Sequence, residues 1–159
     1  MPEAFVAGLD GQTRERVITI LNDQLVEMQA LQMAVKQAHW NLKGDGFIGV
    51  HELLDGVSAR LLTGIDTIAE RAVILGGYAR GTLEAAADKA KMTAYPVELT
   101  DLNDHVKELK DRFLSVGASI RQAATDAAEA GDADTEDLFV EISRALDKDA
   151  WFIGANAPR

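Results

Sequence analysis

The stretch that decides the fold is residues 47–77, FIGVHELLDGVSARLLTGIDTIAERAVILGG, in a chain of 159 residues. Small or apolar residues recur in it at three-, four- and seven-residue steps, the spacing of one face of an α-helix. These positions are Val50, Leu54, Val57, Leu61, Gly64, Ile68 and Leu75. The glycines Gly76 and Gly77 follow directly, and glycine commonly ends a helix. The stretch therefore predicts one long amphipathic helix from about residue 47 to 75.

Three further long helices are predicted on either side of this one. The same periodicity covers residues 13–40, where Asp10 or Thr13 could cap the start, and residues 101–130 and 134–153. The connection between the second and third long helices is long and holds an Ala-rich segment, 82–90, that predicts a short extra helix. Two short connections around a long one predict an all-α, antiparallel four-helix bundle with a single crossover. We expect one domain over residues 1–159, with a short N-terminal tail at 1–12.

Composition excludes several classes of protein. No cysteine is present, so disulfides and thiolate metal sites are impossible and a reducing compartment is expected. The formal net charge of −10 opposes non-specific binding to nucleic acid. The first eleven residues do not resemble a secretory signal, and no apolar run is long enough to cross a bilayer. A soluble, cytoplasmic protein without membrane contact is the expectation.

Two pairs of possible metal ligands lie in the second helix at i, i+4 spacing. His51 is followed by Asp55, and Asp66 by Glu70, so each pair shares a helix face. At 100° per residue all four lie on one side of the helix, within about 100° of one another. That side also carries Ser58, Leu62, Ala69 and Val73, which indicates burial against another surface.

Distance along the axis separates the two pairs. Fifteen residues between His51 and Asp66 correspond to about 22 Å, too far for one metal ion. If two copies of the helix cross antiparallel about a two-fold axis near Arg60 and Leu61, the first pair of one copy meets the second pair of the other. His39, at the end of the preceding helix, can add a nitrogen ligand. Such a nitrogen and oxygen set suits iron, manganese or zinc.

Motifs of other metal and nucleotide enzymes are missing. The segment His51-Glu52-Leu53-Leu54-Asp55 begins like the HExxH zinc-protease motif, but its fifth residue is Asp. No Glu is followed three residues later by His, as in the metal site inside an ordinary ferritin-like bundle. There is also no P-loop and no GxGxxG. A single helical His or carboxylate is usually a packed or solvated side chain, so the set as a whole carries the interpretation.

Nearly the whole chain resembles the Dps family of mini-ferritins. The resemblance rests on His39-Trp40-Asn41, on residues 47–52 with Asp55, on residues 66–71 followed by 75–77, and on the closing LDKDAWF at 146–152. It implies a hollow dodecamer that oxidises Fe(II), preferably with hydrogen peroxide, stores Fe(III) mineral and protects against oxidative damage. It also implies a two-iron site at the two-fold interface. Its ligands are His39, His51 and Asp55 of one subunit with Asp66 and Glu70 of the partner.

The sequence also allows predictions for other residues, in part from this resemblance. Trp40 is similar to the family aromatic that could absorb an oxidising equivalent; the alternative is a buried packing residue. Lys36 could pair with a site carboxylate or be exposed. His105 is expected on the surface. Acidic residues near the turn between the third and fourth long helices resemble those of the family's three-fold pores. A solvated acidic turn and helix cap explains them equally well. These residues are Asp126, Glu129 and Asp137.

A competing function is compaction and protection of DNA, with iron handling secondary. Many relatives bind DNA through a mobile Lys-rich tail. Here the first Lys is Lys36, and the residues before the first helix include Glu3 and Asp10. Direct DNA binding is therefore not expected.

Overall fold

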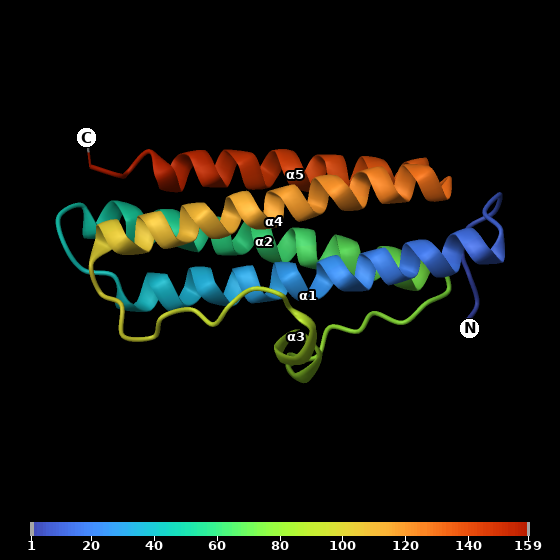
Figure 1. Cartoon of the computed structure of the whole chain (residues 1–159), viewed down its shortest axis with the longest axis horizontal. Coiled ribbons are helices and arrows are strands. Elements are labelled where there is room, and N and C mark those ends of the chain that lie inside the picture. Colours follow the sequence, from blue (N-terminus) through green and yellow to red (C-terminus); the bar gives the residue numbers. More distant parts are fainter. Residues whose placement is uncertain (1, 159) are drawn as a thin grey trace.

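Four long helices lie side by side along their lengths and a short fifth helix crosses the outside of the bundle (Figure 1). The computed structural model describes residues 2–158. The helices are α1 (Gly11–Asn41), α2 (Phe47–Ile74), α3 (Leu83–Lys89), α4 (Leu102–Ala130) and α5 (Ala133–Gly154). Within this described range there is no β-strand, so the predicted all-α bundle with one long crossover is confirmed.

Side-chain caps fix the starts of four helices. The carboxylate of Asp10 accepts the Thr13 N–H, and Asp101 and Asp132 act in the same way at α4 and α5. Thr82 caps the short helix α3. Each cap satisfies a backbone N–H that has no partner inside the helix.

The predicted glycine end of α2 is confirmed. Gly76 adopts φ +87°, a left-handed conformation, and the Gly77 N–H donates to the Ala72 carbonyl at 2.9 Å. A side chain at Gly77 would lie 2.6 Å from Ile18, so α1 also requires glycine there. The Phe5 N–H donates to the Ile74 carbonyl, which places the N-terminal segment against this end of α2.

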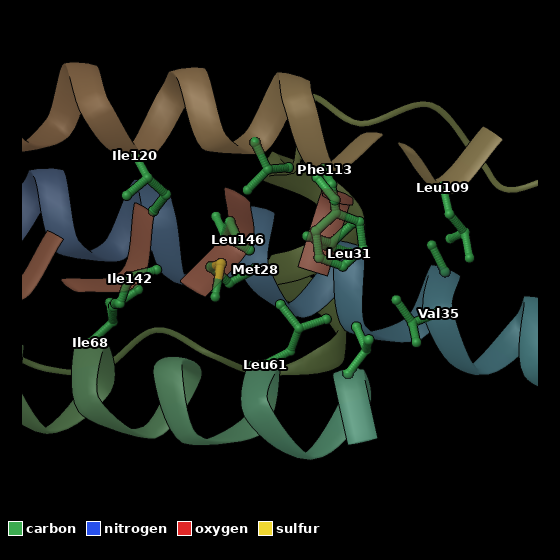
Figure 2. Close-up of a cluster of buried hydrophobic side chains, with 14 of the residues drawn as sticks. Met28, Leu31, Val35, Leu61, Ile68, Leu109, Phe113, Ile120, Ile142 and Leu146 are labelled. Carbon is green, nitrogen blue, oxygen red and sulfur yellow. The ribbon is translucent and has the colours of Figure 1, made fainter. Parts of the chain in front are cut away.

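The hydrophobic core runs along the length of the bundle. Met28 and Leu31 of α1, Leu61 of α2, Phe113 of α4 and Leu146 of α5 point toward one another in its middle (Figure 2). Each of these side chains is at most 2% exposed. The predicted apolar stripes therefore face the core, and the remaining faces of α1 and α2 are left to carry polar groups.

The crossover from residue 75 to 101 is held by side chains of its neighbours. Beyond the ends of α2 and α3, its backbone groups lie outside regular helical hydrogen bonding, and such groups need a hydrogen bond when they are covered. Helix α1 and helix α4 supply them. The side chains involved are Asn22, Glu27, Gln29 and Gln37 of α1 and His105 and Arg112 of α4.

The expectation that His105 lies on the surface is wrong. This imidazole is 1% exposed and bonds to the crossover on both of its nitrogens. Sequence periodicity placed it beside Asp104 and Lys107, but it could not show that the crossover covers this side of α4.

Candidate metal centre

Two imidazoles stack where α1 ends and α2 begins. The rings of His39 and His51 lie 3.7 Å apart, centroid to centroid, with an interplanar angle of 18°. His39 is buried and His51 half-buried. Phe47, one turn before His51, packs against the second ring at 5.1 Å. The first connection is short because Gly46, at φ +81°, allows the chain to turn directly into α2.

Each histidine binds the backbone of the other. His39 Nδ1 lies 2.8 Å from the His51 carbonyl, and His51 Nδ1 lies 2.9 Å from the His39 carbonyl. A carbonyl oxygen only accepts, so both Nδ1 atoms carry the proton and donate. The Nε2 atom of each neutral ring then holds a lone pair. A donor bond from the other ring nitrogen is the usual support of a metal-binding histidine.

Asp55 lies beside the Nε2 atom of His39. Its Oδ1 is 3.4 Å from His39 Nε2 and 2.8 Å from Lys36 Nζ. Two ligand atoms bound to one metal at about 2.1 Å lie roughly 3 Å apart, so His39 and Asp55 can share an ion. The hydrogen bond from Lys36 holds the pKa of the Asp55 carboxyl below its usual value, which keeps it ionised. Of the two interpretations of Lys36, pairing with a carboxylate is the one that the structure shows.

Asp66 and Glu70 lie farther along α2, in the same chain but away from the histidines. Both are exposed, and 15 residues of continuous helix put Asp66 about 22 Å from His51. Within residues 2–158 of a single chain, no three His, Asp or Glu side chains are arranged to hold one metal ion.

The face of α2 that carries the candidate ligands is only partly covered by the chain's own helices. Leu62 is 53% exposed and Val73 45%, whereas Ser58 is buried. The expected burial of this face therefore does not occur within one chain. Trp40 lies beside Lys36 and is 61% exposed. Of its two interpretations, the buried packing residue is therefore wrong for the single chain.

The acidic residues near the α4–α5 turn have different surroundings. Asp126 accepts a hydrogen bond from Gln122, Glu129 lies 3.6 Å from Arg16, and Asp137 is exposed. Asp132, which was not singled out in the sequence, is 2% exposed and pairs with Arg71 at 2.9 Å. The acidic residues near this turn therefore do not all face solvent, because Asp132 joins α2 to the start of α5.

Sequence spacing did not reveal the contacts that hold the two imidazoles. The reciprocal histidine–carbonyl bonds depend on how the first connection folds. The i, i+4 spacing of Phe47 and His51, however, was a readable signal that an aromatic ring would pack against the site.

Comparison with known proteins agrees with this architecture. The family model described as a ferritin-like domain matches residues 18–157. A "DNA protection during starvation protein" of Agrobacterium fabrum is 46% identical over 148 residues, covering 93% of this chain and 91% of that protein. The fold and the matched residues therefore define a ferritin-like protein.

Two solved structures narrow this class. DpsA14 from Streptomyces coelicolor superposes with a TM-score of 0.91 at 32% identity, covering 97% of this chain and 91% of that one. Dps from Microbacterium arborescens, described as being in the high iron form, gives 0.85 at 34% identity and covers 93% and 97%. This chain belongs to the Dps family. Among its described helices, none combines the length and hydropathy needed to cross a membrane.

Proposed function

We propose that this protein is a ferroxidase and iron store that binds its substrate, Fe(II), between two subunits. His39 and His51 of one subunit, with Asp55 beside them, bind iron together with Asp66 and Glu70 of the two-fold partner. Hydrogen peroxide is the preferred oxidant, and Fe(III) mineral collects inside a closed homo-oligomer, expected to be a dodecamer. The observation that carries the proposal is the reciprocal bonding of the two histidines, which leaves both Nε2 lone pairs available to a metal ion.

Two features of α2 support the antiparallel pairing, and the second of them does not involve the ligands. His51 and Glu70 lie equally far on either side of the midpoint between Arg60 and Leu61, and so do Asp55 and Asp66. The same register places Ile48 of one copy opposite Val73 of the other, and Phe47 opposite Ile74. All four are exposed apolar side chains of the single chain, with 38% to 61% of their surface accessible. Burying them would contribute to association through the hydrophobic effect.

The chemistry of this site follows from a ligand set of few protein groups. Two Fe(II) ions held close together can each give one electron to peroxide, which takes up two protons and leaves as two water molecules. Pairing the electrons in this way avoids the hydroxyl radical that a single Fe(II) produces. Exposed Trp40, beside His39, is proposed to absorb a stray oxidising equivalent. The Lys36 hydrogen bond uses only one lone pair of Asp55, so the carboxylate can bind iron while Lys36 holds it in place.

Entry of Fe(II) is proposed to use the acidic α4–α5 region. Asp126 and Asp137 are the better candidates, because Glu129 is already near the Arg16 guanidinium. An acidic entrance would concentrate divalent cations by electrostatic attraction.

The proposed function is tested by adding Fe(II) without oxygen and then adding peroxide. We expect rapid growth of Fe(III) absorbance, with iron and protein eluting together in sizing chromatography at the volume of a closed oligomer. The measurement covers metal, oxidant and assembly together. Iron that precipitates apart from the protein, at the rate seen without protein, would refute the proposal.

Protection of DNA is the second candidate function, because the Agrobacterium fabrum relative carries it in its name. With a net charge of −10, we propose that protection comes from removing iron and peroxide rather than from coating DNA. A gel-shift titration at neutral pH and moderate salt should therefore show little retardation of duplex DNA, since binding requires clustered cations. Salt-sensitive retardation at low protein concentration would instead favour direct binding.

A further inference from the structure

The segment between α3 and α4 is fastened to α4 by two side chains that lie two helical turns apart. Arg112 donates to the carbonyls of Thr93 and Ala94 at 2.7 and 3.3 Å. His105 Nε2 lies 2.9 Å from the Leu99 carbonyl. Between these two anchors, Tyr95 places its ring 4.9 Å from the Arg112 guanidinium. We call residues 93–99 the strap.

The bonds of His105 fit its neutral form. Because the Leu99 carbonyl only accepts, Nε2 carries the proton, and Nδ1 of the neutral ring accepts the Tyr95 O–H at 2.8 Å. The two rings lie nearly parallel, 9° apart. A second proton on Nδ1 would reverse this bond, so that the Tyr95 oxygen accepts and its hydroxyl hydrogen loses its partner. The added charge would also lie on a ring that is only 1% exposed, and both effects oppose protonation in this arrangement.

The groups around His105 raise or lower the pKa of its imidazole. Burial lowers the pKa of the imidazole, although its hydrogen bond to Leu99 and the carboxylates of Asp101, Asp104 and Glu108 act the other way. Glu108 is engaged by Arg112, at 2.7 Å. Burial also raises the pKa of the Tyr95 hydroxyl, which therefore keeps its proton. The strap is thus fastened at neutral pH.

The strap forms one wall of a groove with a volume of about 720 Å³. Met33 of α1 and Leu62 and Ile65 of α2 line the groove across from strap residues Tyr95 and Val97. Leu62 lies next to the midpoint of α2 described above. Movement of the strap would therefore change the shape of a surface beside the proposed two-fold contact.

We propose that His105 is a pH-dependent latch that fastens the strap when neutral and releases it when protonated. A histidine whose pKa is lower in the fastened state stabilises that state above its ordinary pKa, and the stabilisation is lost as the pH falls. The latch consequently opens in mildly acidic solution while the four long helices stay packed. The device does not depend on iron chemistry, because none of its residues belongs to the proposed iron site.

Hydrogen exchange read by mass spectrometry on the full-length protein tests the latch. The Leu99 N–H donates to the Pro96 carbonyl within the strap. After correction for intrinsic rates, its exchange should rise by up to about ten-fold between about pH 7.5 and about pH 5.5, given an ordinary histidine pKa near 6.5. Peptides from the middle of α5 should stay protected, which separates local release from global unfolding. His105→Gln, which cannot titrate, should abolish the rise. The exposed Lys107→Gln is the matched control on α4 and should retain it.

Tyr95→Phe keeps the test decisive if His105→Gln fails to fold. It removes only the hydroxyl, and losing one buried hydrogen bond should raise strap exchange at neutral pH by about five-fold. Equal strap protection at both pH values in the unaltered protein would overturn the proposal. So would an undiminished rise in His105→Gln, or unchanged neutral exchange in Tyr95→Phe.

Discussion

Replacing Glu70 or His51 with Ala should slow Fe(II) oxidation by at least about a hundred-fold while the oligomer still assembles. Losing an outer partner of a metal site already costs roughly ten- to hundred-fold, so losing a ligand should cost at least the upper end of that range. Glu70 is exposed and His51 half-buried in the single chain, and neither belongs to the hydrophobic core. The rate is measured by Fe(III) absorbance after peroxide addition, and assembly by sizing chromatography.

The matched control for Glu70→Ala is Glu15→Ala. Glu15 is another exposed helical glutamate, but it lies near the start of α1 and is not one of the proposed ligands. It should oxidise Fe(II) at the unaltered rate. If Glu70→Ala and His51→Ala also oxidise iron normally, the ligand assignment is wrong even if the protein stores iron by another route.

The fold was accessible from the sequence because its signals are local. Apolar periodicity, an aspartate or threonine before each of α1, α3, α4 and α5, and the Gly76-Gly77 pair are properties of neighbouring residues. Each predicted helix consequently begins and ends within a few residues of the observed one. Such local agreement is what a foldable sequence provides.

The site was only partly accessible, because part of it depends on tertiary contacts. The sequence pointed to His39, His51 and Asp55, and the fold stacks the two imidazoles and places Asp55 beside His39. It could not give the bonds from each imidazole to the carbonyl of the other, nor the burial of His105, since both depend on where a loop lies. Trp40 shows the same difficulty: the sequence left burial open, and the folded chain leaves the ring exposed.

The meeting of His39 and His51 with Asp66 and Glu70 of another copy remains a prediction, and mixed oligomers can test it. One variant carries His39→Ala and His51→Ala, and the other carries Asp66→Ala and Glu70→Ala. Each alone should be inactive, because every site in its oligomer lacks one half of the ligands. Since His39 is buried, His51→Ala alone replaces the first variant if that protein does not fold.

Unfolding and reassembling the two variants together should restore oxidation in part. In a mixed dimer one site combines both damaged halves, and the other combines the intact histidines of one chain with the intact carboxylates of its partner. Random mixing makes about half of the dimers mixed, so about a quarter of all sites should recover under two-fold symmetry. A mass tag on one variant verifies the mixing. Recovery near this fraction is specific to a shared site, because a site built within one chain stays broken in both variants. Verified mixing without recovered oxidation would therefore contradict the pairing of α2 with its copy, whatever the single variants do.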